Sequence, residues 1–221
     1  TPPNTTITGG PSGPTNDVTP TFAFTSSETG SAFECRVDDA AFEACTNPYT
    51  PPELDDETHT FEVRATDAAG NLDATPASRS FTVDTVAPDT TITGGPEGST
   101  NDNTPTFTFV ASEPEVTFEC GFNGAFSECT SPYTSSGIGD GEHTFEVRAT
   151  DAAGNEDAST ASRSFTLDRN PPTTSITSGP SGWTGDSTPT FGITSPEPGA
   201  TFECRLDDAA FQTCTNPHTA A

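Results

Sequence analysis

The sequence has 221 residues, no Lys and a formal net charge of −26. This charge excludes a nucleic-acid-binding protein, because such a protein neutralises phosphates with Lys and Arg. Hydrophobic residues make up only 29% of the chain, although Phe contributes 16 residues, and this composition favours thin all-β modules over a helical protein. No stretch approaches the roughly 20 apolar residues of a membrane-spanning helix.

Two identical segments reveal an internal repeat. HTFEVRATDAAGN occupies residues 59–71 and again residues 143–155, so the offset is 84 residues (143 minus 59). The shorter motifs TPTF and FEC each occur three times at nearly the same offset. We therefore predict three domains: repeat one over residues 1–86, repeat two over residues 87–170, and the first half of repeat three over residues 171–221.

Short alternating runs separated by turn residues predict seven β-strands in repeat one. In chain order they cover residues 5–8, 21–25, 32–37, 42–45, 49–50, 60–66 and 79–83. In the sixth strand, Phe61, Val63 and Ala65 share one face and polar residues take the other, which is typical of a half-buried antiparallel strand. Seven short strands in about 85 residues indicate an immunoglobulin-like sandwich. The predicted fold class is all-β, with tandem immunoglobulin-like antiparallel β-sandwiches.

Several longer motifs carry a family resemblance. TNDVTPTFAF, FECRVDDAAFEACT, DGEHTFEVRATDAAGN and ASRSFTVD resemble the tandem bacterial Ig-like repeats of very large secreted or cell-surface proteins, including adhesins. The resemblance implies extracellular sandwiches joined end to end and used as stalks, spacers or adhesive arrays. Repeat one departs slightly, because LDDETH (54–59) stands where repeat two has IGDGEH (138–143). We expect a less tight corner there.

Each repeat carries two Cys residues, and this regular placement predicts a disulfide within each repeat. The predicted pairs are Cys35/Cys45, Cys120/Cys129 and Cys204/Cys214. Each pair brackets a predicted hairpin turn. Alternation counted from Phe42 puts Cys45 on the opposite face, so we expect a β-bulge or an irregular strand there. The disulfides indicate an oxidising, extracellular location.

The alternative to disulfides is a zinc site, which the sequence disfavours. No pair has the C-x-x-C spacing of a structural zinc site, and only His59, His143 and His218 are available as further ligands. His59 and His143 stand where immunoglobulin-like domains place a corner tyrosine before the sixth strand. We therefore predict a corner hydrogen bond for both residues, not a role as general base, and we predict that the chain is not an enzyme.

Calcium is the one bound ion that the sequence suggests. Two turns share the pattern D-x-x-G-N-x-D, which presents oxygen ligands, and we expect the second turn to face the exit end of repeat one near Glu113 and Glu115. The candidate calcium ligands are Asp67, Asn71, Asp73, Asp84, Asp89, Asp151, Asn155 and Asp157. The alternative interpretation is a turn in which the Asp side chain accepts hydrogen bonds from nearby backbone N–H groups.

Two further residues invite a prediction. Asn4 begins the N-glycosylation pattern N-T-T. Trp183 is the only Trp, and we expect it to cover part of the core of repeat three instead of forming a sugar-binding platform.

Repetition of one module without unique residues predicts a non-enzymatic extracellular structural array. We expect a stalk, spacer or adhesive shaft on a bacterial surface, with neighbouring repeats as its contacts. Residues 171–221 have no counterpart of HTFEVRATDAAGN, and we expect the polypeptide to continue beyond them. Alternatively, an identical chain supplies the missing strands and the chain is a filament subunit. The sequence is also compatible with a glycan- or protein-binding module and with an accessory region of a larger secreted enzyme.

Overall fold

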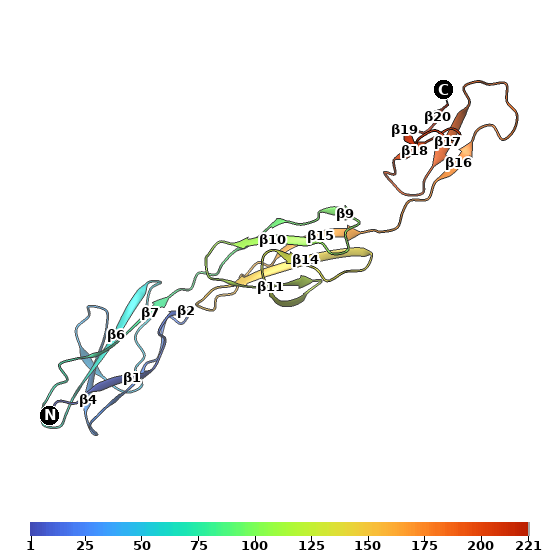
Figure 1. Cartoon of the computed structure of the whole chain (residues 1–221). Coiled ribbons are helices and arrows are strands. Elements are labelled where there is room, and N and C mark those ends of the chain that lie inside the picture. Colours follow the sequence, from blue (N-terminus) through green and yellow to red (C-terminus); the bar gives the residue numbers. More distant parts are fainter. Residues whose placement is uncertain (221) are drawn as a thin grey trace. The chain divides into compact units, whose positions relative to one another are not determined.

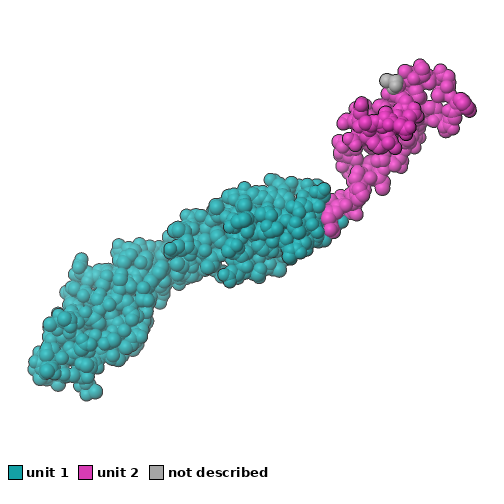
Figure 2. All heavy atoms as spheres, viewed as in Figure 1, with its two compact units in different colours: residues 1–167 teal, residues 168–221 magenta. Residues whose placement is uncertain are grey.

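The computed structural model describes residues 1–220, which form strands, turns and loops without a helix. They divide into two compact units, Thr1–Leu167 and Asp168–Ala221 (Figure 2). Unit 1 contains repeats one and two, and unit 2 contains the third and shorter copy. Within the described residues, no helix is long and apolar enough to cross a membrane.

Repeat one is a sandwich of two sheets (Figure 1). The larger sheet has the strand order β2–β7–β6–β4–β5, and the smaller sheet pairs β1 with β3. The bounds are Thr5–Gly9 for β1, Pro14–Thr15 for β2, Ala23–Ser26 for β3, Ala32–Val37 for β4, Glu43–Cys45 for β5, Thr58–Thr66 for β6 and Ala77–Val83 for β7. Only β2 runs parallel to its neighbour, which is β7.

Repeat two has the same strand order in its larger sheet. Its larger sheet is β12–β11–β14–β15–β9 and its smaller sheet is β13–β10–β8. The bounds are Thr90–Gly94 for β8, Gly98–Thr100 for β9, Thr106–Ala111 for β10, Thr117–Phe122 for β11, Ala125–Cys129 for β12, Tyr133–Thr134 for β13, Gly141–Thr150 for β14 and Ala161–Leu167 for β15. The predicted all-β sandwich is therefore confirmed for both repeats.

The strand prediction missed one element of repeat one and otherwise located every strand. Tyr49 does not form a strand in repeat one but makes a single antiparallel bridge to Phe22. The missed element is β2, which has only two residues. Two residues cannot show alternation, so no sequence pattern marks such a strand.

The core of each sandwich consists mainly of Phe rings from both sheets. β6 buries Phe61 and Val63 completely, as the alternation predicts. Phe22 from the other side of the sandwich stacks on Phe61, with ring centroids 4.2 Å apart. Phe107 and Phe145 make the same stack at 4.0 Å in repeat two. Burying one such side chain contributes roughly 1.5–3 kcal/mol, so a few rings can hold together a domain of low hydrophobic content.

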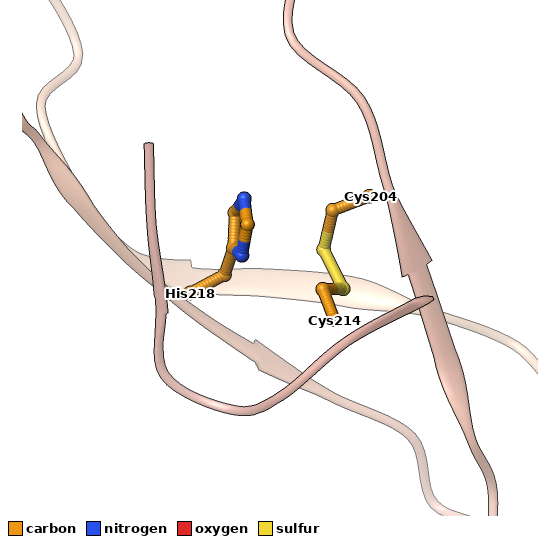
Figure 3. A group of neighbouring side chains, drawn as sticks. All are labelled: Cys204, Cys214 and His218. Atoms are coloured by element: carbon orange, nitrogen blue, oxygen red, sulfur yellow. A yellow bond between two sulfur atoms is a disulfide. The ribbon is translucent and has the colours of Figure 1, made fainter. Parts of the chain in front are cut away.

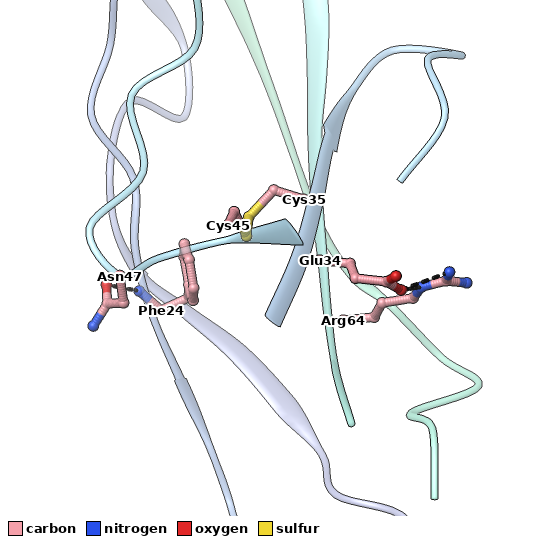
Figure 4. Close-up of a disulfide and its surroundings, with 6 residues drawn as sticks. All are labelled: Phe24, Glu34, Cys35, Cys45, Asn47 and Arg64. Carbon is pink, nitrogen blue, oxygen red and sulfur yellow. Dashed lines mark hydrogen bonds and ion pairs between the residues drawn. A yellow bond between two sulfur atoms is a disulfide. The ribbon is translucent and has the colours of Figure 1, made fainter. Parts of the chain in front are cut away.

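The segment after β5 connects the two sheets by a hydrogen bond. Phe24 N donates to Asn47 Oδ1 at 3.1 Å (Figure 4). Ser131 in repeat two and Asn216 in unit 2 accept the same bond from the corresponding strands. This position therefore has the same structural role in all three copies.

Unit 2 contains the strands of about half a sandwich. One sheet has the order β16–β17–β20 and the other pairs β18 with β19. The bounds are Ser175–Ser178 for β16, Thr190–Thr194 for β17, Phe202–Cys204 for β18, Gln212–Cys214 for β19 and His218–Thr219 for β20. Trp183 does not cover a core as predicted, because its side chain is fully exposed in the loop before β17.

Candidate functional site

Disulfides join the three predicted pairs of Cys residues. The bonds connect Cys35 to Cys45, Cys120 to Cys129 and Cys204 to Cys214. In repeat one the bond links neighbouring strands β4 and β5, and Cys35 is buried in the core (Figure 4). The Cα atoms of this pair are 5.7 Å apart, within the usual range for a disulfide.

The β-bulge expected before Cys45 is absent, and that prediction was wrong. In the regular β4–β5 register, Cys45 lies opposite Phe33 and Glu43 lies opposite Cys35, which places both Cys side chains on the same face. Phe42 is the residue that was misassigned. It lies on the outer face, with Arg36 at 4.5 Å and Arg64 at 4.1 Å from the ring centroid. Cation–π contacts of this kind stabilise by about 0.5–1 kcal/mol at exposed sites.

His218 lies beside the disulfide of unit 2 (Figure 3). One nitrogen of His218 and the two sulfur atoms of Cys204 and Cys214 lie within 4.8 Å of one another. Zinc is bound by deprotonated thiolates, and these two sulfur atoms are bonded to each other. The cluster is therefore a disulfide with a neighbouring imidazole.

The two corner histidines make the predicted hydrogen bond. His59 Nε2 bonds the carbonyl oxygen of Asp55 at 2.9 Å, and His143 Nε2 bonds that of Gly139 at 2.8 Å. Both bonds reach back four residues, to the turn that precedes β6 or β14. The bond fixes the corner where the chain enters these strands, which is a structural role.

His59 has a second partner that His143 lacks in the part of the chain described. Its Nδ1 atom lies 2.8 Å from Asp38 Oδ2. A carbonyl oxygen and a carboxylate both accept, so the protonated imidazolium, in which both ring nitrogens donate, satisfies both partners of His59. Burial acts to lower the pKa of His59, but the bonds to Asp38 and Asp55 outweigh it and raise the pKa above 6.5. Repeat two has Asn123 in place of Asp38.

Asp73 and Asp157 fasten the first strand of each repeat to the turn before the last strand. Asp73 Oδ2 accepts from N of Thr5 at 2.9 Å and from its Oγ1 at 2.8 Å. Asp157 Oδ2 accepts from Thr90 N at 2.8 Å. Both Asp side chains are buried. The sequence suggested these residues only as calcium ligands, because a partner 68 residues away in the chain leaves no local signal.

In the DAAGN turn of repeat one, the Asp side chain accepts hydrogen bonds from nearby backbone N–H groups, as in the alternative to calcium binding. Asp67 Oδ1 accepts from the backbone N of Ala69 at 2.9 Å and of Asn71 at 2.8 Å. Asp67 Oδ2 accepts from Asn71 Nδ2 at 2.7 Å. The hydrogen bonds to Asn71 lower the pKa of Asp67 below its ordinary value. Local bonds therefore suffice to order this turn.

The matching turn of repeat two also contacts the end of repeat one. Asn155 Nδ2 donates to Asp151 Oδ2 at 2.8 Å, as in repeat one, and also to the carbonyl oxygen of Asp84 at 2.9 Å. A longer contact of 3.4 Å reaches the carbonyl oxygen of Val86. We call Asp84, Val86, Asp151 and Asn155 the joint, because they connect the linker after β7 to the second sandwich.

Three carboxylates gather at the joint. Asp84, Glu113 and Asp151 each offer one oxygen, and these atoms lie within 4.8 Å of one another. Asp89 instead lies near Ser159, whose Oγ donates to it at 3.4 Å. Burial acts to raise the pKa of Asp151, but hydrogen bonds, first of all those from Asn155, hold it below its ordinary value. Asp151 is therefore ionised at neutral pH.

Asn4, the predicted glycosylation residue, is exposed at the start of β1. Its backbone N donates to Ser27 Oγ at 2.9 Å. Modification of its side chain stays a prediction.

Comparisons with known proteins match a domain family to two stretches of the chain. The family described as "Bacterial Ig-like domain" matches residues 5–85 and residues 87–169, which is more than half of the chain. No curated protein matches the sequence. Among solved structures, the chain is similar to the fibronectin(III)-like modules of Clostridium thermocellum CbhA, with 13% identity, a TM-score of 0.49, and coverage of 74% of this chain and 94% of that chain.

Two further similar structures come from adhesion proteins. One is a 1.5-MDa bacterial ice-binding adhesin, with 13% identity, a TM-score of 0.42, and coverage of 89% of this chain and 77% of that chain. The other is a tetra-tandem repeat in the extending region of a large adhesion protein, with 19% identity, a TM-score of 0.29, and coverage of 88% and 56%.

Proposed function

Because the chain belongs to the bacterial Ig-like domain family, we propose that it is a spacer segment of an extracellular stalk or adhesive shaft on a bacterial surface. Ig-like sandwiches are typically non-catalytic structural modules. The observation that carries the proposal is the joint: Asn155 binds the linker carbonyl of Asp84 directly. A spacer needs modules that keep their relative placement, and a hydrogen-bonded joint limits bending where a flexible linker does not.

The disulfides support an extracellular location. All six Cys residues are paired, and such bonds persist in oxidising compartments outside the cytosol. The net charge of −26 supports the same assignment, because self-repulsion keeps a surface-exposed array soluble and separate from its neighbours.

The spacer proposal predicts a restricted joint. Spin labels carried by unnatural amino acids at the exposed positions Asp39 and Glu142 report the distance between repeats one and two. We expect a narrow distance distribution in the wild-type chain and a broader one in Asn155→Ala. Asn71→Ala is the matched control, because Asn71 occupies the same turn in repeat one and its side chain bonds to Asp67 within that turn. A broad distribution in the wild type contradicts the spacer proposal.

We also propose that calcium binds at the joint. The support is the group of Asp84, Glu113 and Asp151, because carboxylate oxygens are the ligands that calcium prefers. Calcium takes 6–8 oxygen ligands, so water supplies those that the three carboxylates leave open. The bound ion reduces repulsion among the carboxylates and stiffens the joint.

Thermal unfolding tests the calcium proposal. We expect millimolar calcium to raise the melting temperature of the chain relative to EGTA, and Asp151→Asn to abolish the rise. Asp67→Asn is the control, since it alters the matching turn in repeat one. An equal melting temperature with calcium and with EGTA contradicts the proposal without touching the spacer assignment.

A further inference from the structure

The hairpin between β11 and β12 turns through two residues, Asn123 and Gly124. Both have a positive φ, of 55° and 82°, as a tight turn of this kind requires. Asn123 is the only Asn in the chain that is followed by Gly. This pair is chemically reactive, because Gly has no side chain to keep its backbone nitrogen away from the side-chain amide of the preceding Asn.

The backbone N–H of Gly124 donates a hydrogen bond to a carboxylate. The acceptor is Glu146 Oε2 on the neighbouring strand β14, at 2.6 Å from the nitrogen. A carboxylate at this distance can take the proton from the nitrogen as the nitrogen attacks a carbonyl carbon, which is the role of a general base. Glu146 therefore stands where it can activate Gly124 as a nucleophile.

Glu146 is available for this role because the Arg that binds its counterpart is missing. In repeat one the counterpart is Glu62, which accepts from Arg36 Nε at 2.6 Å in the β4–β6 pair. In repeat two, Gly121 lies opposite Glu146. Glu146 takes part in none of the ion pairs found within residues 1–220. Without a cation beside it, the carboxylate is free to accept a proton.

The side chain of Asn123 is held from the other side by a backbone N–H group. Asn123 Oδ1 accepts from the backbone N of Thr144 at 3.2 Å. Attack on Cγ of Asn123 places negative charge on this oxygen, and an N–H donor that already binds it stabilises that charge. A nucleophile, a base and a donor for the developing charge therefore meet at one turn.

We propose that Asn123 is a self-processing site, which converts to aspartate in the folded protein. In the first step, Gly124 N forms a bond to Asn123 Cγ and gives its proton to Glu146. The Cγ–Nδ2 bond breaks, and ammonia leaves with the proton that Glu146 returns. In the second step, water adds to Cγ of the resulting succinimide, and the bond from Cγ to Gly124 N breaks as this nitrogen regains a proton. The net reaction consumes one water and releases one ammonia.

The same donor directs the second step. Water can attack either carbonyl carbon of the succinimide, and attack on the backbone carbonyl gives isoaspartate instead of aspartate. The N–H of Thr144 binds the oxygen on Cγ, so it polarises the carbonyl whose hydrolysis gives aspartate. The backbone of the turn then keeps its original length, and the site requires no property of the spacer function.

The product fits a position that already holds aspartate in the other two copies. Asp38 and Asp207 occupy this place with φ values of 56° and 53°, close to that of Asn123. Asp38 Oδ1 accepts from the backbone N of Thr60 at 2.8 Å, as Asn123 Oδ1 does from Thr144. The turn can therefore hold a carboxylate without a change in its backbone.

A carboxylate at position 123 also gains a partner. In repeat one, Asp38 Oδ2 lies 2.8 Å from His59 Nδ1. His143 makes the same corner bond in repeat two, through Nε2 to the carbonyl oxygen of Gly139, so its Nδ1 atom can donate to the new carboxylate. Conversion thus gives repeat two the His–Asp pair of repeat one and adds one negative charge to the chain.

Mass spectrometry of the whole chain after incubation at neutral pH tests the proposal. After reduction, cleavage at Glu119 and Glu128 releases residues 120–128. The mass of this peptide reports the change from amide to acid, and electron-transfer fragmentation separates aspartate from isoaspartate. We expect aspartate to form with first-order kinetics that do not depend on protein concentration. The reaction should be faster in the folded chain than in the chain unfolded by urea.

Glu146→Gln tests the base. A positioned general base contributes about 10²–10⁴-fold to a rate, so this variant should react at least about tenfold more slowly than the wild type when both are folded. Glu142→Gln is the matched control, because Glu142 is exposed on the same strand, and it should leave the rate unchanged. The proposal is overturned if the unfolded chain reacts as fast as the folded one, if both variants react at the same rate, or if isoaspartate is the main product.

Asn123→Asp reproduces the product and tests its new bond. At about pH 6, where an imidazole is readily protonated, this variant should unfold at a higher temperature than the wild type. In a His143→Phe background the same substitution should give no such rise. Equal melting temperatures of Asn123→Asp and the wild type would overturn the assignment of the His–Asp pair.

Discussion

Replacing Asp73 with Ala removes the acceptor of four hydrogen bonds, two from Thr5 and two from Thr75. The Thr5 donors are buried, and each buried donor left without a partner costs about 1–3 kcal/mol. The Thr75 donors are less buried and can turn to water. We therefore expect Asp73→Ala to lower the free energy of unfolding of repeat one by about 2–6 kcal/mol, the sum over the two Thr5 donors.

Differential scanning calorimetry measures this loss. A loss of 1 kcal/mol shifts the melting temperature of a domain of 60–100 residues by roughly 4–8 °C. The transition of repeat one should therefore fall by at least about 8 °C. Asp39→Ala is the control, because Asp39 is exposed in the β4–β5 hairpin. A shift no larger than that of the control would refute the reasoning.

The stability lost in Asp73→Ala should be largest at neutral pH and smaller in acid. Burial acts to raise the pKa of Asp73, but the bonds from Thr75 and Thr5 lower it below 3.8. A carboxylate whose pKa is lowered by folding stabilises the folded state. This stabilisation is complete above the unfolded-state pKa of about 4 and disappears as pH falls through the folded-state pKa. The difference between wild type and Asp73→Ala should thus be constant from about pH 7 to 5 and shrink below about pH 4.

Three other substitutions test the remaining features. His59 has a raised pKa, so its contribution to stability is complete below the unfolded-state pKa of about 6.5 and disappears as pH rises through the folded-state pKa. Asp38→Asn should lower the pKa of His59, as measured by NMR titration. The same substitution should remove the pH dependence of stability. Replacing Cys35 and Cys45 together by Ser should cost about 2–3 kcal/mol in chemical unfolding, the entropy of a closed loop of about ten residues; an unchanged midpoint would contradict that value. Gly121→Arg introduces the residue that repeats one and three carry at this position, but a side chain there meets the carbonyl oxygen of Ala125. The hairpin of repeat two is one residue shorter than that of repeat one, and we expect a loss of about 1–3 kcal/mol from overpacking, whereas equal stability of the variant would show that the hairpin adjusts freely.

Sequence patterns predicted the features that depend on short-range order. Alternation in β6 identified its buried face, and the spacing of Cys residues identified the disulfides. The misassignment of Phe42 shows the limit of alternation. Phe42 stands just before the three-residue strand β5, so its face depends on the register of the hairpin, and the register is fixed by pairing with β4.

Bonds between distant segments were not predictable from local sequence. Thr5 and Asp73 stand far apart in the chain, and neither has a neighbouring residue that marks the bond between them. The joint was predicted in part, because the sequence placed the second turn at the exit end of repeat one but gave no sign of the bond from Asn155 to the linker carbonyl of Asp84. Asn71 and Asn155 occupy identical thirteen-residue segments, yet only Asn155 meets a preceding linker. The difference arises from position in the array, which no local pattern records.

The joint also bears on how such a chain can change in length during evolution. Asn155 belongs to a turn that every complete repeat carries, and it binds a backbone carbonyl oxygen, which any residue at that position provides. A duplication of one whole repeat in the gene would therefore create a new connection of the same kind without any further substitution. Unequal recombination between the near-identical copies would have the same outcome. The length of the repeat array can therefore change in steps of one module.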